Sequence, residues 1–154
     1  IKIKNQIEEE FSLVYTGMTR SASSVLSKQK ELTADRIEEL SILRLQAFQV
    51  RSALEKGALS EVGRLLEDSW QIKRTLVDGI TGQQLDQLHD QIIDAGATGA
   101  KLLGAGGGGF FLVHGNSDVR SRLNTTLSPE NKILPLLIDN NGSIIIHDDG
   151  KRWG

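Results

Sequence analysis

Residues 96–115 read GATGAKLLGAGGGGFFLVHG, and the rest of the chain is organised around them. Every position from Gly104 to Gly109 is glycine or alanine, and a strand-like apolar run follows at once. Glycine adopts positive φ and lets another molecule approach the backbone, and successive amides in such a turn form a concave anion site. A flexible linker is the alternative, but linkers are typically polar and serine-rich, whereas apolar residues flank this run. The candidate phosphate-binding residues are Gly104, Ala105, Gly106, Gly107 and Gly108.

Three well-known phosphate loops do not match the surroundings of this run. Gly104, Gly106 and Gly109 satisfy the dinucleotide pattern, but that pattern needs a strand before it and a helix after it. Here a helical period precedes the glycines and a strand follows, so we expect the loop between a helix and a strand. A Walker loop needs lysine after its last glycine, where this chain has Phe110. A protein-kinase loop needs an Asp-Phe-Gly metal site elsewhere, which does not occur in this sequence.

Composition narrows the class of protein. The chain has 154 residues, enough for one domain with a core. Its net charge of −2, with signs interspersed, suggests neither a nucleic-acid partner nor a membrane surface. No cysteine is present and no signal region is visible, so we expect a cytoplasmic protein. His89, His114 and His147 are scattered, and we expect no metal site on them.

Hydropathy patterns predict an α+β fold with an antiparallel sheet and helices gathered on one face. Strands are expected at residues 1–4, 11–15, 110–114, 132–138 and 143–146, with turns at Thr16-Gly17 and Asn141-Gly142. Pro135 places the fourth of these at a sheet edge or bulge. Helices are expected at residues 20–30, 33–56, 58–76 and 83–95, and a short one after a Ser117 cap.

Two apolar stripes on these helices are expected to pack in the core. The stripe on the long helix consists of Ile37, Leu40, Leu43, Ala47, Val50 and Leu54. The next helix carries Trp70 in the same period, and we expect it to be a core residue. Gly57 and Gly96 are placed to end helices.

Four cations are candidates to hold a phosphate or an anionic substrate. Arg20 lies at the start of an expected helix, and Lys73 and Arg74 lie at the end of another. Lys101 precedes the glycine run by three residues. Each has an ordinary alternative: Arg20 as an exposed helix residue, Lys73 and Arg74 as partners of the helix dipole, and Lys101 as a snorkelling side chain. No residue is a convincing general base, so the catalytic group is unknown.

Residues 96–110 resemble the C-terminal glycine-rich motif of the GHMP small-molecule kinases. LVYTG at 13–17, followed by Arg20 and Ala22, and EDSWQIKR at 67–74 extend the resemblance in the same order along the chain. Together the three segments look like the sugar and sugar-phosphate branch, most closely the bacterial D-glycero-D-manno-heptose 7-phosphate kinases. Nothing here resembles the family's Gly-Leu-Gly-Ser-Ser nucleotide loop, and the chain starts at Ile1. The resemblance therefore implies one ferredoxin-like C-terminal domain, residues 1–154, of a longer kinase.

The resemblance also implies a chemistry. It implies phosphoryl transfer from ATP, with Mg²⁺, to a sugar or sugar-phosphate hydroxyl, with heptose 7-phosphate as the expected acceptor. Lys101 and the loop would hold nucleotide phosphate, and Arg20, Lys73 and Arg74 would hold substrate. ATP and Mg²⁺ would be bound mainly by an N-terminal domain, so the 154 residues alone are expected to be inactive. A mevalonate- or homoserine-type kinase and a non-catalytic anion-binding module remain alternatives.

Overall fold

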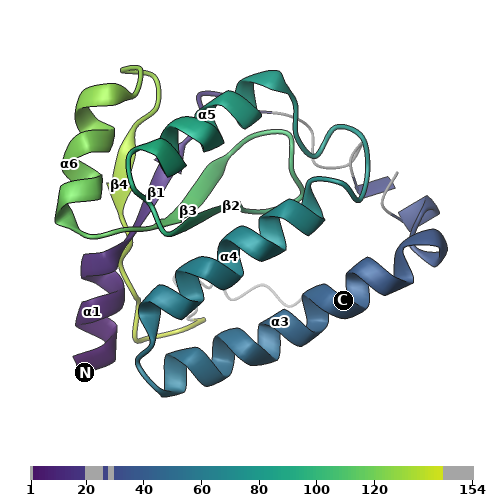
Figure 1. Cartoon of the computed structure of the whole chain (residues 1–154), viewed down its shortest axis with the longest axis horizontal. Helices are drawn as coiled ribbons and strands as arrows, with labels where there is room; N and C mark the ends of the chain where they lie inside the picture. The colour runs from purple at the N-terminus through teal and green to yellow at the C-terminus, as the bar shows by residue number, and fades with distance from the viewer. Residues whose placement is uncertain (1, 20–25, 28–29, 144–154) are drawn as a thin grey trace, which may run out of the picture.

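A computed structural model describes residues 2–19, 26–27 and 30–143 of the chain (Figure 1). Three helices precede the glycine run at some distance: α1 (Lys2–Glu10), the 3-10 turn η1 (Ala34–Arg36) and α3 (Ile37–Glu55). Three more surround the sheet: α4 (Leu59–Lys73), α5 (Gln83–Asp94) and α6 (Ser117–Thr126). The strands are β1 (Phe11–Tyr15), β2 (Gly99–Leu102), β3 (Phe110–His114) and β4 (Ile133–Pro135). No helix in these ranges is both long and apolar enough to cross a membrane.

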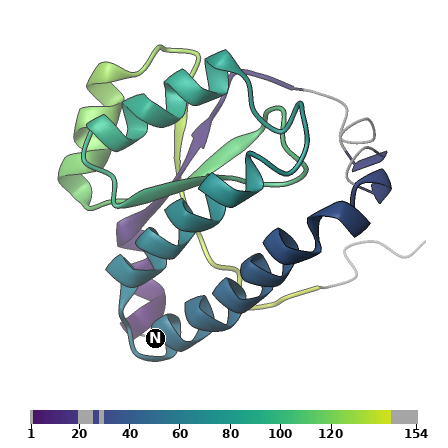
Figure 2. The same ribbon diagram turned by 45° about the vertical axis from the view of Figure 1, so that its right-hand side comes forward.

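The four strands form one antiparallel sheet in the order β2-β3-β1-β4. Val14 at the middle of the sheet lies opposite Phe111 of β3 and Ile133 of β4. Figures 1 and 2 show α5 and α6 over the same face of the sheet, with α4 alongside β2 and α3 outside α4. The α+β, ferredoxin-like fold predicted from the sequence is confirmed, because strand, helices, two strands, helix and strand follow in that order.

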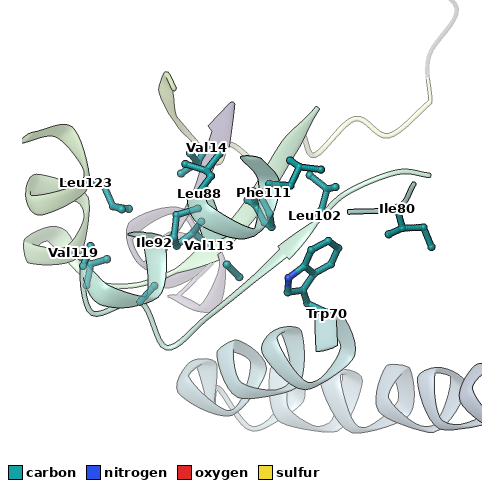
Figure 3. Packing of buried hydrophobic residues seen from close by; sticks show 14 of the residues in the cluster. Val14, Trp70, Ile80, Leu88, Ile92, Leu102, Phe111, Val113, Val119 and Leu123 are labelled. Atoms are coloured by element: carbon teal, nitrogen blue, oxygen red, sulfur yellow. The ribbon is translucent and has the colours of Figure 1, made fainter. Parts of the chain in front are cut away.

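The main core lies between this face of the sheet and the helices (Figure 3). Alternate strand residues, Val14, Phe111 and Val113, point toward Leu88, Ile92 and Leu123 of the helices. Trp70 is fully buried, as predicted, and its ring meets Phe111 edge-on at a centroid distance of 5.5 Å. The helix spacing of three and four residues therefore identified the inward side chains of α5 and α6 correctly.

Two expectations about the first half of the chain are wrong. Residues 2–10 form α1 rather than a strand, because Ile3 and Ile7 lie one helical turn apart and pack beside Phe11 in a second cluster. The stripe on α3 is not core along its whole length, since Ile37 is 62% and Leu40 is 38% exposed. Among the described elements α3 packs mainly on α4, so only residues such as Ala53 on its inward side are buried.

The last third also departs from the sequence reading. Asn116, not Ser117, caps α6, with its Oδ1 accepting from the Val119 amide at 3.1 Å. The strand expected at 132–138 shrinks to β4, which lies at the sheet edge as Pro135 indicated. The glycine run joins two strands, because β2 precedes it. The hairpin into residues 144–146 and most of the helix expected at 20–30 lie outside the described residues.

Strand β2 was invisible to hydropathy patterns because its residues have low strand propensity. Gly99 instead fits this edge by size: a Cβ there would lie 2.0 Å from the carbonyl oxygen of Gly63. The backbones of β2 and α4 therefore touch, and only glycine allows this approach.

Candidate functional site

The glycine loop is the connection of residues 103–109 between β2 and β3. Gly104, Gly106, Gly107, Gly108 and Gly109 all have positive φ, between 69° and 150°. L-residues rarely adopt this region, so the sequence of the loop determines its path.

Backbone hydrogen bonds hold the loop against its neighbours on both sides. The Gly107 amide donates to the Ile80 carbonyl at 2.8 Å, and the Gly109 amide donates to the Met18 carbonyl at 3.0 Å. The Gly109 carbonyl accepts from the Thr16 amide at 2.9 Å and from the Thr16 hydroxyl at 3.0 Å. The segment before α5 and the segment after β1 therefore fix the loop from two sides.

The glycines of this loop serve two different purposes. A Cβ at Gly106 would lie 2.8 Å from the Cα of Ile80, and one at Gly108 would lie 2.5 Å from the Met18 carbonyl oxygen. A Cβ at Gly104 or Gly109 would meet nothing within 4 Å. Gly106 and Gly108 are thus required by packing of the loop on the domain, whereas Gly104 leaves open space beside its backbone.

Four of the five predicted loop residues retain a backbone donor for a ligand. The amides of Gly104, Ala105, Gly106 and Gly108 donate to no acceptor in the described part of the chain, whereas that of Gly107 is taken by Ile80. Adjacent N–H groups in left-handed and turn conformations form anion-binding concavities. The loop can therefore offer several donors to phosphate oxygens.

Lys73 is the predicted cation that the fold brings to this loop. Its ammonium donates to the carbonyl oxygens of Leu102, at 2.9 Å, and Gly104, at 2.6 Å. Burial and the neighbouring charge of Lys101 lower the pKa of Lys73 to about 8. No carboxylate within the described ranges forms an ion pair with it. A phosphate at the loop would supply the missing negative charge.

The other predicted cations are placed differently. Lys101 donates to the Ser69 hydroxyl at 2.6 Å, and burial lowers the pKa of Lys101. Arg74 pairs with Asp86 and lies over the Trp70 ring, 5.8 Å from its centroid, so it links α4 to α5. Arg20 lies outside the described residues.

Sequence reasoning missed a partly buried polar cluster around Glu67. The Glu67 carboxylate accepts from His89 Nε2 at 2.9 Å, from Gln71 at 2.6 Å and from the Ala100 amide at 3.2 Å. Burial raises the pKa of Glu67, but the hydrogen bonds from these three groups outweigh it and hold the pKa below its usual value. The cluster joins α4, α5 and β2. His89 occupies a core position on α5, which was the only signal for it in the sequence.

A polar groove of about 410 Å³ lies beside the segment that holds the loop. Its lining includes Thr16, Met18, Gln84, Gln87, Gln91 and Asn131. Met18 and Gln84 also line a smaller cavity of about 130 Å³. This cavity is bordered by Gly107 of the glycine loop and by the first residues of α5. Amide and hydroxyl side chains both donate and accept hydrogen bonds, so the groove suits a ligand with several hydroxyl groups. No cluster of three or more metal-binding side chains occurs among the described residues.

Comparison with protein families finds one matching model, described as "GHMP kinases C terminal", over residues 50–126. This range covers half of the chain and includes α4, α5, the glycine loop and α6.

Two curated proteins are similar to this chain in sequence, and one solved structure is similar to it in fold. The D-glycero-alpha-D-manno-heptose 7-phosphate kinase of Campylobacter jejuni is 28% identical over 116 residues, covering 71% of this chain and 34% of that protein. The bifunctional fucokinase/GDP-fucose pyrophosphorylase of Arabidopsis thaliana is 33% identical over 113 residues, covering 71% of this chain and 11% of that protein. The L. major mevalonate kinase in complex with R-mevalonate superposes with a TM-score of 0.65 at 23% identity, covering 83% of this chain and 43% of that one. The chain thus spans about a third or less of the length of these two curated relatives.

Proposed function

The chain belongs to the GHMP kinase family, and on that premise we propose that it is the C-terminal domain of an ATP-dependent sugar-phosphate kinase. The proposed reaction moves the γ-phosphoryl group of ATP onto a hydroxyl of heptose 7-phosphate. The observation that carries the proposal is the glycine loop, with four amides directed to no described acceptor and the Lys73 ammonium at its base. Heptose 7-phosphate is favoured as acceptor because the Campylobacter relative is named for it and because the neighbouring groove is polar.

The proposed role of the loop is to bind and neutralise phosphate oxygens. Phosphoryl transfer depends mainly on positioning and on stabilising negative charge. Rigid amides suit that task, since Ile80 and Met18 hold the loop in place before any ligand arrives. Lys73 would add a charge-assisted hydrogen bond, and its pKa of about 8 leaves it mostly protonated at neutral pH. ATP with Mg²⁺ would supply the transferred group and screen its charge.

Lys101, Arg74 and Arg20 have lesser parts in this proposal. Lys101 acts through its charge beside Lys73, because its ammonium is bound to Ser69. Arg74 would have to exchange its Asp86 partner to reach a substrate phosphate. Arg20 is proposed to hold the acceptor's phosphate, since it follows the Thr16 segment along the chain.

An N-terminal kinase domain of the same polypeptide is the proposed partner. It would supply the main nucleotide loop, most ligands of Mg²⁺ and the group that acts on the acceptor hydroxyl. The 154 residues alone are then inactive. We also propose a cytoplasmic location, because the chain has no cysteine and ATP is its proposed co-substrate.

A phosphoryl-transfer assay on the full-length protein tests the proposal. MgATP is offered with heptose 7-phosphate, fucose, galactose or mevalonate in parallel, and ADP release is measured. We expect turnover of heptose 7-phosphate, with a loss of activity in Lys73→Met but not in Lys56→Met, whose side chain is exposed. Turnover of mevalonate alone would assign the other branch of the family. If none of the four acceptors is turned over, the alternative of a non-catalytic anion-binding module replaces the kinase. Turnover by the 154 residues alone would refute the proposed need for a second domain.

A further inference from the structure

Strand β2 lies at one edge of the sheet, and side chains of α4 pair with its free backbone groups. β2 is bonded to β3 on one side, and no other described strand adjoins it. Ala100 and Leu102 are two residues apart, so their backbone groups point to the same edge. The Ala100 amide donates to the Glu67 carboxylate at 3.2 Å, and the Leu102 carbonyl accepts from Lys73 at 2.9 Å. An edge strand otherwise presents unpaired groups, and α4 supplies partners for two of them.

Glu67 is held in one position by three donors. His89 Nε2, at 2.9 Å, and the Ala100 amide donate to the same carboxylate oxygen, and Gln71 donates to the other at 2.6 Å. The His89 side chain is only 4% exposed and comes from the core side of α5. Hydrogen bonds to an ionised carboxylate are shorter and stronger than neutral ones. Glu67 therefore fastens β2 to two helices at once.

The backbones of α4 and β2 also touch, which sets how the two elements lie along each other. A Cβ at Gly99 would lie 2.0 Å from the Gly63 carbonyl oxygen and 2.9 Å from the Cβ of Glu67. The six residues from Glu67 to Lys73 rise by about 9 Å along a helix, and three strand residues span about 10 Å. The two elements thus stay in register from Ala100 to the start of the glycine loop.

The position of Lys73 depends on this register. Its two acceptors, the carbonyls of Leu102 and Gly104, belong to β2 and the loop, whereas Lys73 itself belongs to α4. A slip of β2 by one residue moves both carbonyls by about 3.3 Å, which is more than a hydrogen bond tolerates. Ile80 and Met18 bond to later residues of the loop and not to Gly104. The contact with α4 therefore positions the first part of the loop.

We propose that Glu67 is a positioning residue for the phosphate site. By fixing the edge of β2 against α4, it places the Leu102 and Gly104 carbonyls around the Lys73 ammonium and aligns the first amides of the loop. The inference rests on the proposed role of this loop in phosphoryl transfer. Glu67 touches no phosphate, because three donors already occupy its carboxylate and its negative charge repels another anion.

The pH dependence of Lys73 acylation in the full-length protein tests this inference. Only the neutral amine reacts, so mass spectrometry of the labelled peptides gives the pKa of Lys73, with exposed Lys56 as internal control. We expect a pKa of about 8 in the wild type. Glu67→Ala should raise it by about 1 unit or more toward the ordinary 10.5, because the ammonium loses its carbonyl partners and becomes solvated. Loss of a negative charge alone would lower the pKa of a lysine, so the direction separates position from charge.

Three further variants serve as controls. Glu67→Gln keeps an acceptor oxygen for the Ala100 amide and should leave the Lys73 pKa close to 8. Leu123→Ala removes a fully buried side chain at the other end of the core from Trp70 (Figure 3) and should destabilise the fold without moving this pKa. Glu67→Asp keeps the charge on a side chain one methylene shorter, so it should raise the pKa as Glu67→Ala does. Circular dichroism checks folding, and Glu67→Asp decides if Glu67→Ala does not fold.

Three results would overturn the inference: an unchanged or lowered Lys73 pKa in Glu67→Ala or Glu67→Asp, an equal rise in Leu123→Ala, and an equal rise in Glu67→Gln. The phosphoryl-transfer assay adds a second readout, in which Glu67→Ala should lower kcat/KM by about 10-fold or more and Glu67→Gln by less. Equal losses in the two variants would also contradict the positioning role. If the wild type transfers no phosphate, the proposed function fails, whereas the titration of Lys73 still decides whether Glu67 positions it.

Discussion

Gly106→Ala should lower the free energy of unfolding much more than Gly104→Ala, although the sequence gives no reason to separate the two positions. Both glycines have positive φ, +111° and +69° respectively. At Gly106 an added Cβ would lie 2.8 Å from the Cα of Ile80 and 3.0 Å from its carbonyl oxygen. At Gly104 it would enter open space. The comparison therefore isolates the contact of the loop with the Ile80 backbone.

The expected sizes follow from separate contributions. A left-handed L-residue costs about 1–2 kcal/mol, and the reduced entropy of the unfolded chain offsets roughly 0.4–1 kcal/mol of this. Gly104→Ala should therefore destabilise by about 1 kcal/mol. Gly106→Ala adds about 1–3 kcal/mol for overpacking against backbone that cannot rotate away. It also loses about 1 kcal/mol as the Gly107 to Ile80 hydrogen bond is forced apart, giving about 3–5 kcal/mol in all.

Urea unfolding of the two variants and the wild type, followed by circular dichroism, measures the difference. A gap of about 2 kcal/mol or more between the variants is expected. Equal destabilisation by both variants would contradict the close packing of the glycine loop against the backbone of Ile80. A larger effect at Gly104 than at Gly106 would contradict the open space beside Gly104.

Three further outcomes are expected. The folded pKa of Lys73, about 8, lies below its ordinary 10.5, so the unfolded chain binds more protons between these values and the melting temperature should rise with pH across this window. Lys73→Met should show a smaller rise, because only the contribution of Lys101, whose pKa burial also lowers, is left. Lys56→Met should keep the full rise, and a flat wild-type profile would contradict the burial of the Lys73 ammonium. The pKa of Glu67 is lowered in the folded state, so the ionised carboxylate stabilises the protein above its ordinary pKa, and this stabilisation is lost on acidification. Glu67→Gln should therefore lower the urea midpoint at about pH 7 more than at about pH 3. An equal drop at both pH values would rule out an ionised Glu67. Phe111→Ala should destabilise by about 3–5 kcal/mol, because Phe111 is fully buried against Trp70, whereas Phe110→Ala, at a half-buried position, should cost less in the same urea titration.

The spacing of hydrophobic residues was sufficient to predict a helix and its buried side where one face of that helix packs against the core. The spacing of Leu85, Leu88 and Ile92 identified α5 and its inward side, and Trp70 was identified in the same way. It was insufficient for α1, where Ile1-Lys2-Ile3-Lys4 alternates like a strand over too few residues to separate a period of 2 from one of 3.6. It also failed for the outer half of α3, because a stripe of apolar residues does not reveal whether a partner covers it.

By itself the sequence determined the α+β class and the position of the glycine loop, because hydrophobic period and glycine content act over a few neighbouring residues. The family followed from the resemblance of three short segments, which is also a property of the sequence alone. Tertiary structure alone decided which amides the loop leaves open, since Ile80 and Met18 hold it from distant parts of the chain. It also decided which lysine serves the loop: Lys101 is closer in sequence to Gly106, but Lys73 reaches the Gly104 carbonyl across α4 and β2. Such contacts depend on how backbones approach one another in space, which no local spacing of residues records.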